Sequence, residues 1–557
     1  MTSSRSRRIV AIGACLVIGL GTRLFPLWWS SLPATLDGLV YARHARRTIV
    51  TGGLPLAGFR ADALVSTVLL STGSLITSVQ PLRLAQPLYA TVGATGVLLG
   101  VAFARRLGDS LGWSSSRRRR AAVLAALALA VEGVFVRRTG VPDDDAITLV
   151  TIPLAALVVH CYAISERPAW LVVAGSLLVA LPLTHTFSTL IAALVLLALV
   201  AGYLVGRPLT RGTLGVVALV GGFAAYFVGY YAWAGSETQL VVPYVDRVQS
   251  SPGLFLAWLI VLVVFVPWFQ RTSRRLRRAV AFVPLVVVFG VIAVNARVVV
   301  FPGTAATPRI VLWLVLPLAV PAVLAAVGAH RFGRIGPVEP VLLAMFVAPI
   351  IQILFSLTAG LTPEYFATAL RAQTHFHLPV LVLASGVVAD LHPARDALRS
   401  RSGRLLARYG RPAIVVLFVF TLVATLPVAY VNLDTGSYPS TTTESEFAAG
   451  TFSARYLAGQ WTSSHTQVRI PANYFGGVNA SVSPAASWLR GGPVPDCPVV
   501  AQRSWTTTGA HLFPGAPETI EPNTYRRWKA ERSLVYAAGG HDPIVVTVPR
   551  GDTGTRC

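Results

Sequence analysis

The chain contains thirteen long runs of apolar residues, separated by short polar segments. A helix needs roughly 20 predominantly apolar residues to cross a bilayer, and each run approaches that length. The pattern therefore predicts a polytopic α-helical membrane protein with about 13 spans. The runs begin near Arg8, Leu82, Ala121, Ala146, Ala169, Ser188, Thr213, Gly253, Ala279, Ile310, Val338, Leu378 and Ala413.

Two segments near the N-terminus need a separate interpretation. The first run follows several arginines, as in a signal peptide, but residues 23–29 after it contain no small-residue cleavage site. It is therefore expected to be a retained anchor. Residues 63–79 are apolar but short and rich in Ser and Thr. We expect them to form an interfacial or re-entrant helix within a long first external loop, residues 30–81.

Arginine placement predicts the orientation, because basic residues accumulate in short cytoplasmic loops. With a cytoplasmic N-terminus, alternate loops contain the arginine-rich segments 105–106, 117–120, 271–278 and 395–411. A multi-pass protein of the cell membrane with an extracytoplasmic C-terminus follows. The net charge of +24 is dispersed over these loops. It is therefore a topology signal, and the prediction is that no nucleic acid is a partner.

Composition changes sharply after Tyr430. Overall, 54% of the residues are hydrophobic and 13% are charged, but residues 432–557 lack long apolar runs and gain Ser, Thr, Gly and Pro. This predicts a transmembrane domain over residues 1–431 and a small extracytoplasmic α/β domain over residues 432–557.

The C-terminal part contains short patterned stretches and two cysteines. Alternation at residues 468–470 and 544–548 predicts strands, and residues 524–530 predict a helix. Cys497 and Cys557 can form a disulfide, because an extracytoplasmic compartment permits it. Two unpaired thiols are the alternative.

Three consecutive acids, Asp143, Asp144 and Asp145, lie at the mouth of a predicted span. Asp143 and Asp145 can direct carboxylate oxygens at one Mg²⁺ or Mn²⁺, which in turn would hold a phosphate. The alternative is helix capping, because Asp is favoured at the N-cap and in the first turn.

A further acid, Asp37, follows the first span. On helical spacing it shares a face with Tyr41 and His44. Such a carboxylate can act as a general base toward an acceptor hydroxyl or as a metal ligand. An N-cap, or an ion pair with a nearby arginine such as Arg43, is the alternative.

The order of these features resembles the catalytic subunits of oligosaccharyltransferases, and more broadly the GT-C glycosyltransferases, which use polyprenyl-phosphate sugar donors. The shared features are the first span followed by an external Asp, the long external loop, the acidic cluster and the external C-terminal domain. The local matches are residues 36–55, 140–146 and 183–188; the last is similar to a Thr-His turn of archaeal members.

The resemblance implies roles for particular residues. Asp37 matches the catalytic carboxylate, and Asp143 and Asp145 match the metal motif, with Mg or Mn as cofactor or none if arginines replace it. Lipid-linked phosphate would be bound by Arg297, Arg371 and His375, since arginine can bond phosphate bidentately. Snorkelling at an interface is the alternative for the arginines. The implied partners are a polyprenyl-phosphate-linked sugar, an acceptor protein or glycan, and membrane lipid.

The chain also departs from the oligosaccharyltransferases. It has no WWDYG-type motif, only Trp461 and Trp488 in other contexts, and residues 301–307 contain no acid, so that Glu364 is the nearest substitute. The expected function is therefore inverting sugar transfer to an unassigned acceptor at the extracytoplasmic face.

Two other functional classes remain open. A secondary transporter or lipid flippase would use Glu132, Asn295 and Arg297 as coupling sites within the membrane. A non-catalytic membrane scaffold would simply present the C-terminal domain. Clustering of the acids at one face, without an apparent inverted repeat, favours the enzyme.

Overall fold

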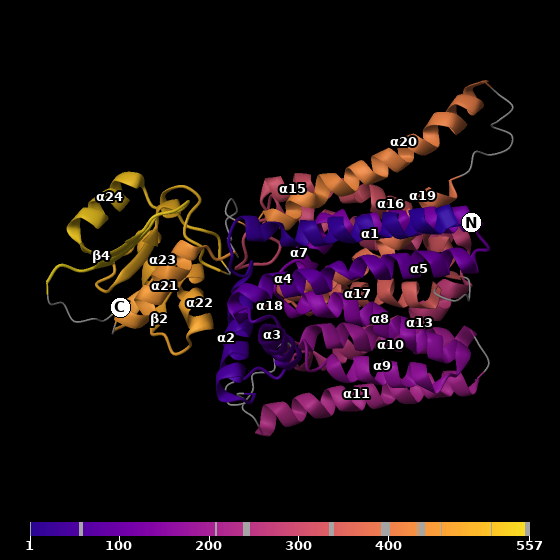
Figure 1. Ribbon diagram of the computed structural model, residues 1–557, viewed down its shortest axis with the longest axis horizontal. Coiled ribbons are helices and arrows are strands. Elements are labelled where there is room, and N and C mark those ends of the chain that lie inside the picture. Colours follow the sequence, from indigo (N-terminus) through magenta and orange to yellow (C-terminus); the bar gives the residue numbers. More distant parts are fainter. Residues whose placement is uncertain are drawn as a thin grey trace.

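A computed structural model shows a bundle of long helices with a smaller domain at one end (Figure 1). We call that end the α2 end, after helix α2 (Leu36–Thr51), and the opposite end the N-terminal end. The structure describes residues 2–54, 59–206, 209–237, 245–333, 339–391, 401–431, 433, 441–457, 459–513, 515–551 and 557.

Eleven segments among the described residues are long and apolar enough to cross a membrane. They are formed by α1 (Thr2–Leu24), α4 (Pro81–Ala94) with α5 (Gly96–Ser110), α8 (Asp144–Ser165), α10 (Thr186–Gly206), α11 (Arg211–Glu237), α13 (Pro252–Arg271), α14 (Arg274–Asn295), α15 (Arg309–Val315) with α16 (Ala319–Gly328), α17 (Glu339–Ala359), α18 (Pro363–Ala372) with α19 (His377–Asp390), and α20 (Arg401–Thr425). The other two predicted spans are the shorter helices α6 (Ser115–Val131) and α9 (Pro168–Ala180). Each of the thirteen apolar runs thus forms a helix.

Small residues let the helices approach closely. A Cβ on Gly100 of α5 would lie 3.1 Å from the carbonyl oxygen of Ala125 in α6, and Ala121, Ala125 and Ala128 are fully buried. Such contacts suit a membrane, where helices gain stability from close packing more than from excluding water. The α5–α6 pair is therefore a tightly packed unit of the bundle.

The chain breaks its helical course at Glu132, inside the bundle. The Glu132 carboxylate accepts hydrogen bonds from the backbone N–H groups of Val134 (2.9 Å) and Phe135 (2.8 Å) and so caps α7 (Gly133–Thr139). A Cβ on Gly133 would lie 1.9 Å from the carbonyl oxygen of Thr425, so this close approach requires glycine. The break places the end of α7 beside the start of α8.

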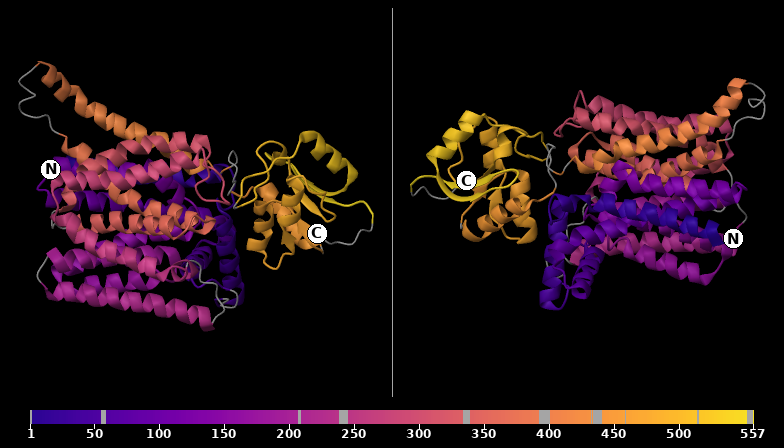
Figure 2. Two further views of the ribbon diagram at one scale, coloured as in Figure 1. Left: turned by 180° about the vertical axis from the view of Figure 1, so that it is seen from behind. Right: turned by 45° about the horizontal axis from the view of Figure 1, so that its top comes forward.

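Helices α2 and α3 (Leu64–Thr77) form the first loop. In both views of Figure 2, α2 crosses the end of the bundle between the spans and the C-terminal domain. Thr35 caps α2 by accepting a hydrogen bond from the N–H of Gly38 (3.0 Å). The helix predicted over residues 63–79 is confirmed as the 14-residue α3.

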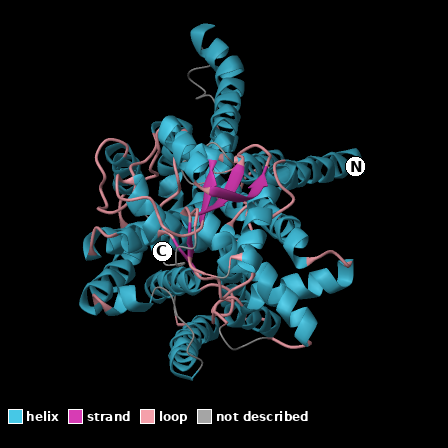
Figure 3. Cartoon of the chain, turned by 90° about the vertical axis from the view of Figure 1, so that its left-hand side faces the viewer, coloured by secondary structure: helices cyan, strands magenta, loops and turns pink. Residues whose placement is uncertain are grey.

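The C-terminal domain contains a five-stranded sheet among its described residues, with strand order β2-β1-β3-β5-β4. Figure 3 shows its strands in magenta. Strands β1, β2 and β3 are parallel, and β5 is antiparallel to β3 and β4. The strands are β1 (Trp461–Thr462), β2 (Ala480–Ser481), β3 (Val499–Gln502), β4 (Ser533–Ala538) and β5 (Ile544–Val548). The helices are α21 (Glu444–Tyr456), α22 (His465–Tyr474), α23 (Ser483–Leu489) and α24 (Pro522–Glu531). The predicted small α/β domain is confirmed.

One predicted strand of this domain is wrong. Residues 468–470 lie in α22, whereas the strand over 544–548 and the helix over 524–530 are confirmed as β5 and α24. Ser464 caps α22 by accepting from the N–H of Gln467, and Val468 and Ile470 are both buried. Three alternating residues are too few to distinguish a period of two from one of 3.6.

One disulfide lies within the domain, and two hydrogen bonds attach the domain to α2. Cys497 and Cys557 form a disulfide, which decides between the two alternatives left by the sequence. The Asn473 side chain donates to the carbonyl oxygen of Leu36 (2.8 Å), and Arg43 donates to that of Ala472 (3.2 Å). The helix that carries Asp37 is therefore docked on α22.

Acid should weaken this domain, because His511 is buried with its Nδ1 2.6 Å from the Thr466 hydroxyl. Burial, and then the nearby His465, lowers the pKa of His511 to about 3. The unfolded chain takes up a proton below pH ~6.5 and the folded domain does not, so stability is full above ~6.5 and is lost as the pH falls toward 3.

We expect the domain to lose up to about 2 kcal/mol of unfolding free energy between pH 7.5 and pH 5 through His511. Thermal unfolding of the full chain, followed by tryptophan fluorescence, measures this. His511→Gln should reduce the pH dependence, whereas His541→Gln, which changes an exposed histidine, should retain it. An equal pH dependence in both variants would contradict the assignment.

Candidate active site

The acidic triplet at the start of α8 is buried, and its three carboxylates have different partners. Asp143 is 8% exposed, and Asp144 and Asp145 are fully buried. Asp143 is the N-cap of α8, and its Oδ1 accepts from the N–H of Asp145 (3.4 Å). The capping alternative considered for the triplet therefore applies to Asp143, but capping does not account for the other two.

Asp144 ties α8 to the first loop. Its Oδ2 accepts a hydrogen bond from the Tyr41 hydroxyl (2.5 Å) in α2, and its Oδ1 accepts one from the Ser66 hydroxyl in α3. Both oxygens of this buried acid are thus satisfied by hydroxyl donors, as a buried polar group requires. The role of Asp144 is to hold the two loop helices against the bundle.

Asp145 is the centre of a second network. Its Oδ1 lies 3.3 Å from Nδ1 of His185 and accepts from the Ser188 hydroxyl (3.3 Å). Its Oδ2 has no hydrogen-bond partner among the described residues, but a guanidinium nitrogen of Arg138 lies 3.7 Å away. This carboxylate is therefore surrounded by cationic and donor groups.

Arg371 extends the network through His185. A guanidinium nitrogen of Arg371 lies 3.0 Å from Nε2 of His185. Because a guanidinium can only donate, Nε2 accepts from Arg371, while Nδ1 lies beside the Asp145 carboxylate. The chain Arg371–His185–Asp145 links α18 to α8.

Asp62, in the first loop, supports the His185 turn. Its buried carboxylate pairs with Arg60 (2.9 and 3.0 Å) and accepts from both the hydroxyl (2.9 Å) and the N–H (3.3 Å) of Thr186. Thr186 is the first residue of α10. The first loop thus holds the start of α10, and with it His185, against α8.

Asp37 lies in the first turn of α2, half-buried, beside the turn that carries the triplet. The Thr35 hydroxyl donates to the carbonyl oxygen of Pro142 (3.0 Å), and the charges of Asp37 and Asp143 are close enough to interact. Thr35, not Asp37, caps the helix, and no recorded ion pair of the described residues involves Asp37. Neither alternative to a functional role for Asp37 therefore applies.

A large cavity adjoins this network. It comprises about 1210 Å³ of atom-free space, including space open to the exterior, and its walls are mostly apolar side chains of α14, α15, α16 and α19. Arg137 and Arg138 at the end of α7 line it together with His377, Asn295 and Thr307. Because Arg138 also lies 3.7 Å from Asp145, it connects the cavity to the acidic network.

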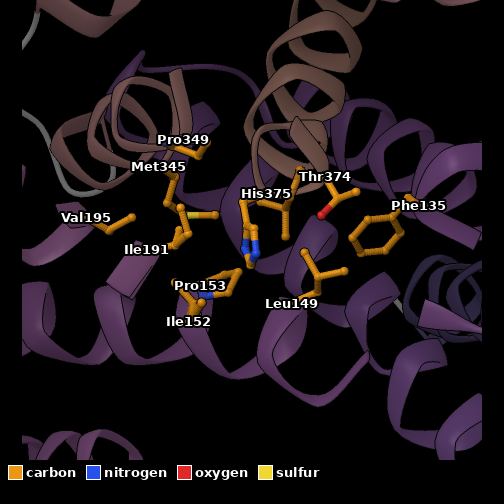
Figure 4. Close-up of a pocket in the computed structure, with 11 residues that line it drawn as sticks. Phe135, Leu149, Ile152, Pro153, Ile191, Val195, Met345, Pro349, Thr374 and His375 are labelled. Atoms are coloured by element: carbon orange, nitrogen blue, oxygen red, sulfur yellow. The ribbon is translucent and has the colours of Figure 1, made fainter. Parts of the chain in front are cut away.

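His375 projects into a second, smaller space between α8, α10 and α17, as Figure 4 shows. About 290 Å³ of atom-free space lies here between apolar side chains such as Leu149 and Ile191. Nε2 of His375 has no hydrogen-bond partner among the described residues, and the Asp145 carboxylate is close enough to act on the ring electrostatically. The neighbouring Thr374 lines both cavities.

The structure brings together most of the residues singled out in the sequence. Asp143, Asp145, Arg371 and His375 interact in one group, and Asp37 joins it through Asp143. Arg297 does not line the large cavity and has an exposed side chain, although Asn295 two residues earlier does line it. Its phosphate-binding role stays a prediction without a recorded contact to the group.

Sequence reasoning assigned no role to His185 or to the pair Arg137 and Arg138. The signals were present: His185 belongs to the Thr-His turn, and the two arginines directly precede the turn to the acidic triplet. They come close to Asp145 because of the break at Glu132 and because α10, which His185 precedes, packs against α8. Neither is visible in a linear pattern.

The residues as placed do not fit a divalent cation. Among the described residues, no group of three or more His, Cys, Asp and Glu side chains is arranged to hold a metal ion. Asp145 contacts His185 and Ser188 through one oxygen and faces the cationic Arg138 with the other. Mg²⁺ and Mn²⁺ prefer several oxygen ligands. The metal site at Asp143 and Asp145 stays a prediction from sequence, and the arginines are the positive charges that the geometry supplies.

Neighbouring acids should differ in their effect on stability. Asp144→Ala leaves the Tyr41 and Ser66 hydroxyls without their acceptor, which should lower the free energy of unfolding by about 3 kcal/mol. Asp143→Ala removes only a cap and should cost about 1 kcal/mol. Denaturant titration in detergent micelles compares them. An equal loss at the two positions would show that Asp144 does not hold the loop helices.

Comparisons with known proteins complete this description. No protein-family model matches the sequence, and no curated protein matches it. The chain is similar in structure to the archaeal oligosaccharyltransferase AglB from Archaeoglobus fulgidus, solved in complex with an inhibitory peptide and a dolichol-phosphate. The TM-score is 0.50 at 15% sequence identity, over 90% of this chain and 70% of that chain. ArnT from Cupriavidus metallidurans, solved bound to undecaprenyl phosphate, gives a TM-score of 0.48 at 15% identity over 97% of both chains. The chain therefore has a GT-C-like fold, as the order of features in the sequence predicted.

Proposed function

We propose that this protein is a glycosyltransferase that moves a sugar from a polyprenyl-phosphate carrier to an acceptor at the α2 end of the bundle. Arginine placement predicts that this end is extracytoplasmic, with the N-terminus in the cytoplasm. One observation supports the proposal most strongly: the mostly apolar cavity between the spans is lined by Arg138, which lies 3.7 Å from the buried Asp145. A long apolar chain with an anionic head matches that combination.

The carrier would bind with its prenyl chain against the apolar cavity wall. Its phosphate would lie at Arg137 and Arg138, since guanidinium groups bind phosphate oxygens through parallel hydrogen bonds. Asp145 and His185 would orient Arg138 and Arg371 toward the phosphate. The positive charge near the leaving group is then preorganised before the reaction.

The reaction would proceed by inversion at the anomeric carbon. Asp37 accepts the proton of the acceptor hydroxyl, the acceptor oxygen forms a bond to the anomeric carbon, and the bond from that carbon to the phosphate oxygen breaks. Polyprenyl phosphate leaves with the electron pair of that bond, and the arginines stabilise its additional negative charge. Asp37 suits this role because it lies beside Asp143 and is not held in an ion pair among the described residues.

The acceptor would approach from the C-terminal domain. Asn473 and Arg43 join α22 of that domain to α2, and Ser31 donates to the Glu444 carboxylate (2.8 Å) in the same region. An acceptor held on the domain would therefore be positioned next to Asp37. The chemistry defines it only as a hydroxyl- or amide-bearing protein or glycan.

The contacts of the proposed coupling residues support a transporter less well than an enzyme. Glu132 caps α7 and pairs with His377 (3.0 Å), and the Asn295 side chain bonds Thr307 and the N–H of Val300 (both 2.9 Å). Both side chains therefore have fixed structural partners. A coupling site needs groups that can change partners during transport.

Replacing Asp37 tests the proposed base. With a radiolabelled polyprenyl-phosphate sugar in proteoliposomes, Asp37→Asn should lower transfer by about 10²- to 10⁴-fold, because the hydroxyl loses its proton acceptor. Donor binding should persist. Asp246→Asn, which changes an exposed acid of α12 (Val245–Gln249), is the control and should transfer normally. Full transfer by Asp37→Asn would exclude the catalytic role, and wild type that binds donor without any transfer would favour a transporter or scaffold.

Replacing Arg138 tests how the leaving phosphate is neutralised. Arg138→Gln should reduce transfer by roughly 10²-fold, because one preorganised charge at the phosphate is lost. EDTA should leave the wild-type rate unchanged if arginines supply that charge. Loss of activity in EDTA, with recovery on adding Mg²⁺ or Mn²⁺, would instead establish the metal site at Asp143 and Asp145.

A further inference from the structure

A basic hollow lies at the N-terminal end of the bundle, far from the acidic network. It is formed between α1, α5 and α6 and comprises about 520 Å³ of atom-free space, including space open to the exterior. Three guanidinium groups line it, those of Arg105, Arg118 and Arg119, together with the Ser115 hydroxyl. Figure 1 shows the N-terminus and the C-terminal domain at opposite ends of the bundle, so this hollow and the proposed active site lie at opposite ends.

The positive charge of the arginines in this hollow is only partly balanced by acidic neighbours among the described residues. Arg118 pairs with Asp109 of α5. Arg105 and Arg119 have exposed side chains, and the recorded ion pairs of the described residues include neither of them. An orientation signal requires only that arginines occur on one side of the membrane. It does not require three of them to converge on one hollow between spans.

The wall of the hollow is apolar on the side of the membrane. Ile12 of α1 and Val123 of α6 line it beside the arginines. Along α1, Ile9 is 62% exposed and Val17 is 71% exposed, as expected for a helix that faces lipid. The hollow therefore joins a charged rim to a lipid-facing apolar surface.

We propose that this hollow binds the phosphate headgroup of an anionic phospholipid from the adjacent leaflet. The arginines would bond the phosphate oxygens, Ser115 would donate to the headgroup, and the acyl chains would lie along the exposed face of α1. Inorganic phosphate has the same charge but no apolar part, so it would not use the Ile12 and Val123 wall. The site is independent of the proposed sugar transfer.

Native mass spectrometry of the full chain in mild detergent tests this site. Dioleoyl-phosphatidylglycerol should bind at least tenfold more tightly than dioleoyl-phosphatidylcholine at one saturable site. The double variant Arg105→Gln/Arg119→Gln should lose about 25-fold in affinity, which corresponds to about fivefold per arginine. Arg167→Gln removes the same charge from an exposed loop residue outside the hollow and should bind normally.

A second variant tests the same site independently, in case the first variant does not fold. Val123→Trp retains every charge and fills the hollow, so it too should lose the tight phosphatidylglycerol site, while circular dichroism and gel filtration report an intact fold. Equal binding of the two lipids by wild type would overturn the proposal. So would equal phosphatidylglycerol affinity in the double variant and Arg167→Gln. Displacement of the lipid by millimolar inorganic phosphate would reassign the hollow to a soluble anion.

Discussion

The arrangement of this protein depends on the burial of carboxylates at the start of α8. An isolated buried charge is very costly, so each acid must be paired or hydrogen-bonded. Asp144 is satisfied by hydroxyls of α2 and α3, and Asp145 by groups of α7 and α10. Satisfying two neighbouring side chains therefore draws four helices to one place. The geometry of the candidate site is a consequence of that requirement.

Breaks between helices position the side chains that surround the buried carboxylates. Non-helical backbone within a membrane is tolerated where it is buried in protein or lines a cavity. The break at Glu132 places Arg137 and Arg138, the turn before α10 places His185, and the 3₁₀ turn Gln373–Phe376 places His375. All three breaks border the large or the small cavity or the acidic network. These three breaks therefore lie where the chemistry is proposed.

The two ends of the bundle differ in their electrostatics. At the α2 end, acids and arginines neutralise one another inside the protein, and the C-terminal domain covers this end through α22 and α2. At the N-terminal end, three arginines line a hollow, and among the described residues Asp109 is the acid that pairs with one of them. Interior charges suit the stabilisation of a reacting phosphate, whereas exposed charges suit contact with a membrane surface.

The sequence by itself determined the membrane class, the helical runs, the small α/β domain and the identity of the acidic positions. These follow from local properties, since the length of an apolar run and the period of a pattern can be read along the chain. It predicted Asp37, Asp143, Asp145, Arg297, Arg371 and His375 as site residues, but it could not show which acid pairs with which base. The strand predicted over residues 468–470 was wrong for a related reason. Three residues are too few to show a period, and Ser464 caps a helix that includes them. Only the tertiary structure separated the roles of Asp143, Asp144 and Asp145, brought Arg138 and His185 to Asp145, and left Arg297 outside the group. Those outcomes depend on helix packing and on breaks such as Glu132, and the energy of a buried charge is decided by partners far away in the chain.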